Sequence, residues 1–114
     1  MALNIFGGTD HPKKFNFKEL NSVALQSASA VLGQILPGGR REGVNYVVRN
    51  PRRSDRSSGS FKINVHNGLW ADFATNDRGG DLISLIAYID DSSQMQAARR
   101  LANMIGFDMG GWNA

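Results

Sequence analysis

Apolar residues recur every three or four positions in the first third of the chain, beyond a leader rich in glycine and polar residues. This spacing predicts one amphipathic helix over about 17–35. Asn16 and Glu19 are placed to form a capping box at its start, and the run Pro37-Gly38-Gly39 ends it. The first third of the chain is therefore expected to place one helix in front of the rest of the fold.

The middle of the chain changes to a two-residue alternation, which is typical of strands. We expect one strand at about 43–49, ended by Pro51, and a hairpin of strands 60–65 and 69–74 joined at 66–68. The ten residues between the first strand and the hairpin are polar and basic, so they are expected to form a loop.

The register of that hairpin depends on its turn. A two-residue turn at Asn67-Gly68 would pair Ile63 with Asp72 on the apolar face. A three-residue turn with Gly68 in the left-handed conformation places nearly every apolar residue on one face, so it is preferred. The pairs it predicts are Phe61 with Phe73, Ile63 with Ala71, and Val65 with Leu69.

The preferred register leaves Trp70 on the outer face, next to a Lys62–Asp72 pair. An outward indole beside cations is suited to stacking on a nucleobase. The alternative is that another element covers Trp70, because large aromatic side chains are seldom left fully exposed.

Two helices are expected after the hairpin. Asp81 can cap an apolar, buried helix that runs through 82–89, and Ser93 with Gln96 opens a last helix that stops at Gly106. The predicted fold class is therefore α+β. It is a small antiparallel sheet of about three strands, packed by one N-terminal and two C-terminal helices.

The domain boundaries follow from these elements. Residues 1–15 are expected to be an irregular leader, 16–106 a single domain, and 107–114 a tail. The length of 114 residues fits one domain.

Cysteine is absent, which excludes disulfides and thiolate chemistry. The N-terminus does not resemble a secretory signal and no apolar run could span a membrane, so a cytoplasmic protein is expected.

Positive charge is concentrated in the middle of the chain. The whole chain carries a net charge of +3, but residues 40–62 hold seven cationic side chains against two acidic ones, and six of the seven are arginine. Arginine forms bidentate contacts with phosphate, so this segment is expected to bind nucleic acid. The alternative is a charged loop that serves only solubility.

No catalytic constellation is evident. His11 and His66 lack a nucleophile at a useful spacing. Asp72 and Asp77 could bind a hard cation, although ordinary ion pairing is the simpler interpretation. The chain is therefore expected not to be an enzyme.

The order of several short motifs resembles the N-terminal zinc-binding domain of bacterial-type DNA primases, above all the divergent versions at the front of phage and plasmid primase-helicase proteins. The motifs are Tyr46-Val-Val-Arg-Asn-Pro-Arg-Arg, Gly59-Ser-Phe-Lys-Ile-Asn, Gly68-Leu-Trp-Ala-Asp-Phe-Ala and Gly79-Gly-Asp-Leu-Ile-Ser-Leu. The likeness covers about two-thirds of the chain, residues 38–105.

The resemblance implies a zinc-ribbon-like core, but the four ligand positions of the family are replaced here. They read Asn50, Arg53, Asp72 and Thr75, which is not a structural zinc set. We therefore expect no cofactor and no metal, and an Arg53–Asp72 salt bridge is a candidate replacement for the metal clip.

The resemblance also implies a function in replication, the binding of single-stranded template for a separate primase polymerase domain or a helicase. The alternative is a protein-interaction module derived from such a domain, which would dock on a replication protein. The expected nucleic-acid contacts are the cations of the middle segment and two aromatic residues: Arg49, Arg52, Arg53, Arg56, Lys62, Arg78, Tyr46 and Trp70.

Overall fold

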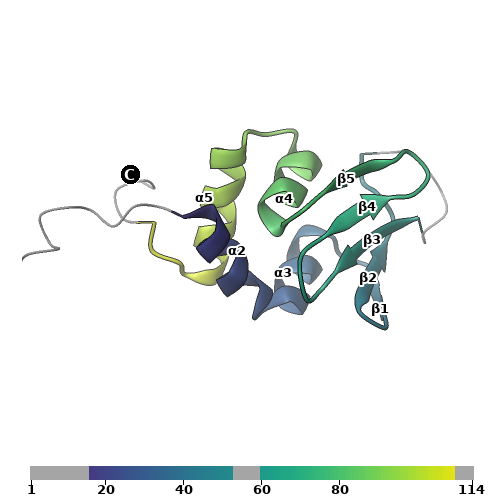
Figure 1. The fold of residues 1–114 in the computed structure, drawn as a ribbon, viewed down its shortest axis with the longest axis horizontal. Coiled ribbons are helices and arrows are strands. Elements are labelled where there is room, and N and C mark those ends of the chain that lie inside the picture. Colours follow the sequence, from purple (N-terminus) through teal and green to yellow (C-terminus); the bar gives the residue numbers. More distant parts are fainter. Residues whose placement is uncertain (1–15, 53–59, 110–114) are drawn as a thin grey trace, which may run out of the picture.

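The computed structural model describes residues 16–52 and 60–109. Within these residues the chain forms four helices and five strands, with the helices on one side of the sheet (Figure 1). The fold class α+β is confirmed. The expected leader 1–15 and the end of the expected tail lie outside the described residues.

The first helical segment is two helices, α2 (Phe17–Leu25) and α3 (Ala28–Ile35), and the prediction of one continuous helix is wrong. Gln26 and Ser27 donate their backbone N–H groups to carbonyls three residues back, at 3.1 and 2.9 Å, which tightens the turn and ends α2. Neither glycine nor proline marks this break. The Asn16 side chain caps α2 as expected, accepting from the N–H groups of Lys18 and Glu19.

The sheet has five antiparallel strands in the order β1-β2-β3-β4-β5, rather than about three. They are β1 (Arg40–Glu42), β2 (Asn45–Val48), β3 (Phe61–Asn64), β4 (Trp70–Asp72) and β5 (Asp77–Gly79). The two unexpected strands, β1 and β5, are three residues long and mostly exposed, so they carry no alternating apolar signal.

The turn between β3 and β4 sets a register that differs from the predicted one. Ile63 pairs with Trp70 and Phe61 pairs with Asp72, one residue away from the expected pairs. The cause is a four-residue turn in which the Asn64 side-chain oxygen accepts from the N–H groups of His66 and Asn67. Because side chains alternate along a strand, this slip turns every residue of β4 to the opposite face.

Two capped helices complete the fold as expected. Asp81 caps α4 (Leu82–Asp90) in a capping box with Ser84, and Ser93 caps α5 (Gln94–Ile105) in a capping box with Gln96. Gly106 ends α5 in the left-handed conformation. Helix α4 packs against both α5 and α2.

The core lies between the helical layer and the inner face of the sheet. Phe61, Ile63 and Trp70 pack there with the fully buried α4 residues, Leu82, Ile83, Leu85 and Ile86. Beyond α5, Phe107 packs against this core and Met109 is buried in it, so the start of the expected tail belongs to the fold. No helix in the described part of the chain combines the length and apolar character needed to cross a membrane.

Candidate nucleic-acid interface

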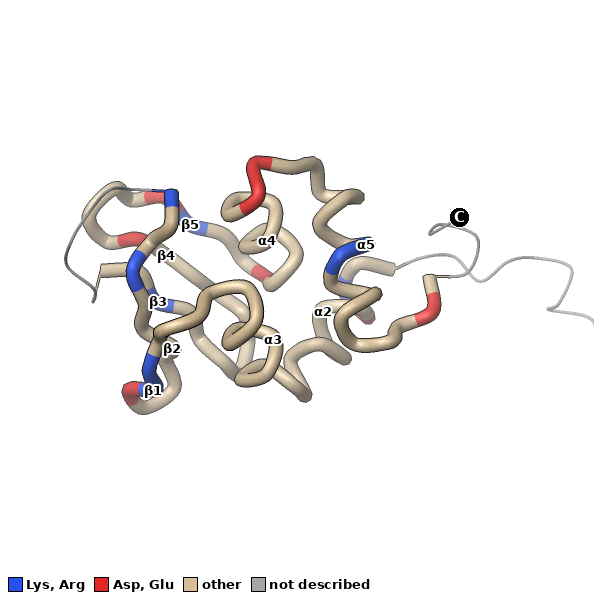
Figure 2. Tube along the Cα trace, turned by 180° about the vertical axis from the view of Figure 1, so that it is seen from behind, with Lys and Arg blue, Asp and Glu red and all other residues tan. Residues whose placement is uncertain are grey.

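The outer face of the sheet, turned away from the helices, carries a row of cations that crosses all five strands. The paired positions run Arg40, Val47, Lys62, Ala71 and Arg78, one residue from each strand in order. Directly paired residues point to the same face, so the three cations lie on one surface with small or apolar residues between them. With neighbouring strands about 4.8 Å apart, this cross-sheet row spans about 19 Å. Figure 2 shows basic positions distributed over the strands.

Among the residues of the five strands, one acidic side chain lies on the same face. Glu42 forms an ion pair of 2.6 Å with Arg40, and both side chains are about half exposed. Such an exposed pair contributes little and is easily exchanged for another anion. The face therefore keeps a net positive charge.

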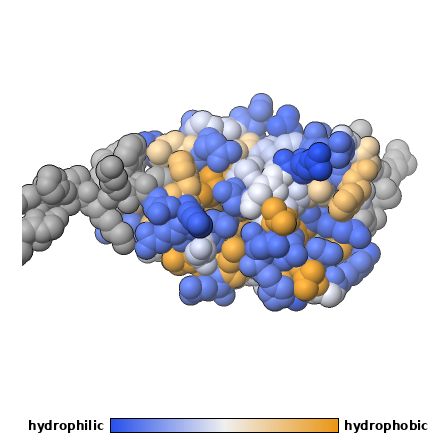
Figure 3. All heavy atoms as spheres, in the orientation of Figure 1, coloured by the Kyte–Doolittle hydropathy of each residue, from blue (hydrophilic) through white to orange (hydrophobic). Residues whose placement is uncertain are grey.

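An exposed aromatic residue adjoins the row. Phe73 follows β4 and is 71% exposed, and the Lys62 ammonium lies 6.0 Å from the centre of its ring. Leu69, before β4, is 53% exposed. Figure 3 shows hydrophobic side chains beside hydrophilic ones at the sheet end of the molecule. The face thus combines cations with an exposed ring, the two ingredients of single-strand binding.

Trp70 is not part of this surface, and the prediction of an outward indole is wrong. Its side chain is 5% exposed, its Nε1 donates to Ser84 Oγ at 3.0 Å, and its ring lies 4.9 Å from that of Tyr88. Gly79 pairs with Trp70, and a side chain there would overlap the indole. The four-residue turn exchanges the two aromatic residues: Trp70 moves inside and gains its hydrogen bond to Ser84, and Phe73 takes the outer position.

The predicted Lys62–Asp72 pair is wrong for the same reason. Lys62 pairs with Ala71 on the outer face, whereas Asp72 is fully buried on the inner face.

Tyr46 is also unavailable for stacking, contrary to the prediction. Its side chain is buried on the inner face, where the hydroxyl donates to the Leu36 carbonyl at 2.6 Å and accepts from the Gly39 N–H at 3.2 Å. The residue fastens the connection between α3 and β1 to the sheet. The hydroxyl of a buried tyrosine needs such partners.

The predicted cations lie in four different settings. Lys62 and Arg78 belong to the cross-sheet row, and Arg49 is exposed just beyond β2. Arg52 instead packs over the Tyr88 ring at 5.3 Å and donates to the Tyr88 carbonyl at 2.9 Å. Arg53 and Arg56 lie outside the described residues. Arg40, which sequence reasoning did not place in the site, joins it through β1.

Two of the four positions that the sequence resemblance assigned to zinc ligands, Asn50 and Asp72, meet in the interior. Asn50 Nδ2 donates to Asp72 Oδ2 at 2.9 Å, and both residues are buried. The other oxygen of Asp72 accepts from the Ala74 N–H at 2.9 Å. Thr75 lies in the following turn, where its Oγ1 accepts from the Asp77 N–H at 3.3 Å. Arg53, the proposed partner of Asp72, lies outside the described residues.

Tyr88 of α4 extends this contact into a network. Its hydroxyl accepts from Asn50 at 2.9 Å and donates to Asp77 Oδ2 at 2.7 Å. Burial raises the pKa of Tyr88, the bond to Asp77 acts in the same direction, and the bond from Asn50 opposes them. The network ties the end of β2 to β5 and α4. No group of three or more His, Cys, Asp or Glu residues in 16–52 and 60–109 is arranged to hold a metal ion.

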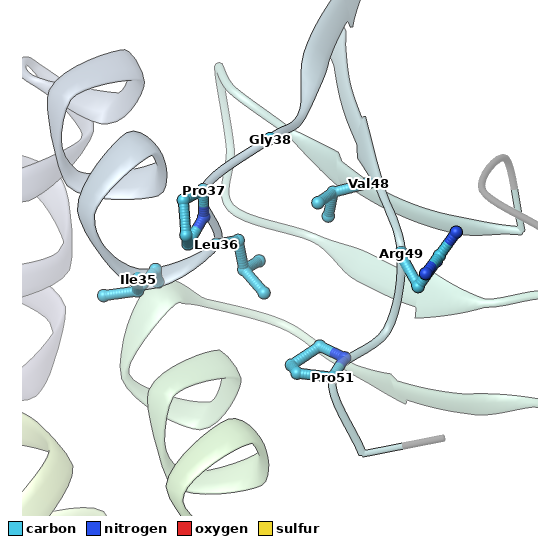
Figure 4. A pocket seen from close by; sticks show the side chains of 7 residues that line it. All are labelled: Ile35, Leu36, Pro37, Gly38, Val48, Arg49 and Pro51. Atoms are coloured by element: carbon cyan, nitrogen blue, oxygen red, sulfur yellow. The ribbon is translucent and has the colours of Figure 1, made fainter. Parts of the chain in front are cut away.

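A separate hollow lies away from the sheet's outer face, where the connection from α3 to β1 passes the end of β2. Its volume is about 450 Å³. Figure 4 shows Leu36, Val48 and Pro51 directed into it and the guanidinium of Arg49 directed away. Arg49 is the one charged residue among the described residues that line this hollow, whereas the cross-sheet row brings three cations together.

Comparison with known proteins adds no assignment: no protein-family model matches this chain, and a search of curated proteins found no match.

Proposed function

We propose that this chain is a non-catalytic module that binds single-stranded DNA across the outer face of its sheet. The observation that carries the proposal is the cross-sheet row Arg40–Lys62–Arg78 next to the exposed Phe73 ring. Cations that follow a backbone, with an aromatic side chain on which a base stacks, bind single strands without requiring a duplex groove.

The motif order described above supports placing this binding in DNA replication, as the template-binding part of a primase. In this proposal the fold is a zinc-ribbon-like domain without metal. The Asn50–Asp72 contact, extended by Tyr88, takes the place of the metal clip between the two loops.

Anisotropy titrations of a labelled oligothymidylate test the proposal. An oligonucleotide of about 15 residues is long enough for one small single-strand-binding fold. The variant is Lys62→Ala/Arg78→Ala. The matched control is Lys18→Ala/Arg99→Ala, which also removes one lysine and one arginine but from α2 and α5.

We expect tight, salt-sensitive binding by the wild type. Each phosphate contact contributes about 0.7 to the slope of log K against log salt for single strands, so the sheet variant should lower the slope by about 1.4. The control should leave it unchanged. Absence of binding at low salt, or an equal loss in the control, would overturn the proposal.

A protein-docking module is the second candidate, because exposed Leu69 and Phe73 side chains also suit an apolar partner. Salt separates the two functions, since an apolar protein interface does not weaken steeply as salt rises.

A further inference from the structure

A hollow of about 230 Å³ opens on the outer face beside the cross-sheet row. Its floor is Ala71, whose small side chain lies between the large exposed side chains of Leu69 and Phe73 along the same strand. Residues two apart on a strand share a face, so these three line up with the small one in the middle. The two apolar walls suit a flat, aromatic occupant.

The third wall of the hollow carries hydrogen-bond donors. Asn64 lines the hollow and uses its side-chain oxygen to accept from the His66 N–H at 2.8 Å, so its NH₂ group is the part of the side chain that can donate to an occupant. Lys62, whose ammonium group only donates, also lines the hollow. Asn45 pairs with Asn64 across the strands and adds a further amide.

We propose that this hollow is a pocket for one unpaired base and that it favours thymine or uracil over adenine. The inference rests on the proposed single-strand binding. A base between Leu69 and Phe73 buries its faces, while donors at one edge match the carbonyl oxygens of thymine or uracil rather than the amino group of adenine. The cation–π contact between Lys62 and Phe73 is exposed and weak, so a base replaces it at small cost.

The test fills the pocket without changing any charge. Ala71→Ile introduces a side chain that is favourable in strands and that fills the floor of the hollow. Ala71→Ser is the matched control, because its small side chain leaves the space open. Both are titrated with oligothymidylate, oligoadenylate and an abasic strand of equal length, and their circular dichroism is compared with that of the wild type to confirm folding.

We expect the wild type to bind oligothymidylate about tenfold more tightly than the abasic strand, the effect of one well-stacked base. Ala71→Ile should lose that difference and the preference over oligoadenylate, with an unchanged salt slope, and Ala71→Ser should keep both. Adenines also stack on one another in the free strand, which by itself favours the binding of oligothymidylate. A thymine preference with this cause does not depend on the pocket and would survive in Ala71→Ile.

The outcomes separate the two proposals. The base pocket is overturned if binding is salt-sensitive but the abasic strand and oligothymidylate bind with equal affinity. It is also overturned if Ala71→Ile binds all three strands as the wild type does. Either result leaves the proposal of binding by the sheet face intact. Equal wild-type affinity for oligothymidylate and oligoadenylate overturns the base preference. No binding to any of the three strands overturns both proposals.

Discussion

At the scale of single residues, the buried side chain of Asn50 makes three hydrogen bonds. It donates to Asp72 and to the Tyr88 hydroxyl, and its oxygen accepts from the Arg52 N–H at 2.9 Å. A buried polar group is costly only when its partners are missing. Removing the Asn50 side chain therefore takes one hydrogen bond at once from Asp72, from the Tyr88 hydroxyl and from the Arg52 N–H.

Asn50→Ala is expected to destabilise the fold by about 2–3 kcal/mol, because it leaves buried acceptors without their donor. Asn45→Ala, on the outer face, is the matched control and should change stability by less than about 0.5 kcal/mol. Urea denaturation followed by circular dichroism measures both. Equal stability of the two variants would contradict the structural role of the network.

At the scale of elements, the turn between β3 and β4 decides which aromatic residue faces outward. Gly68 adopts a φ of +80° in this turn, and its N–H donates to the Asn64 carbonyl at 2.8 Å. A side chain there would also come within 3.3 Å of the Asp81 backbone at the start of α4. The turn is thus held both by its own conformation and by the helix next to it.

Gly68→Ala is expected to cost about 1–2 kcal/mol, because alanine is strained at this φ and crowds Asp81. Gly33→Ala provides the opposite case. Gly33 is exposed in α3 with open space around it, so alanine should stabilise the helix by about 0.5–1 kcal/mol. Thermal denaturation of both variants checks the sign, and a stabilised Gly68→Ala would show that the turn is not as described.

At the scale of the whole molecule, the helical layer and the inner face of the sheet share one core, whereas β1, at one edge of the sheet, lies outside this core. Helix α4 contributes four fully buried side chains, and all three residues of β1 are exposed. The proposed binding surface therefore crosses the central strands and extends to the exposed edge strand β1.

Hydrogen exchange should reflect this gradient. We expect the central amides of α4 to exchange only through global unfolding, and those of β1 to exchange through local opening with a smaller free energy. Saturating oligothymidylate should slow exchange in β1, since Arg40 belongs to the cross-sheet row. Equal protection of α4 and β1 in the free protein would contradict this division.

The chain's own pattern determined its α+β class, the positions and caps of the last two helices, and the presence of a β3–β4 hairpin. These features depend on local signals, such as Asp81 with its capping box and Gly106 at a helix end, and local hydrogen bonds form wherever those residues occur. The sequence also named Lys62 and Arg78 among its expected nucleic-acid contacts from their charge, and the structure places both on the outer face of the sheet.

Only the tertiary structure decided the register of the β3–β4 hairpin and which residues lie together on the candidate surface. Counting apolar residues favoured burial of Phe73, but the Asn64 turn, the bond from Trp70 to Ser84 and the contact of Asn50 with Asp72 outweighed it. These partners lie far apart in sequence or depend on a turn whose alternatives differ by one residue. One residue of slip exchanges the two faces of a strand, so long-range contacts placed Trp70 inside and Phe73 on the proposed binding surface.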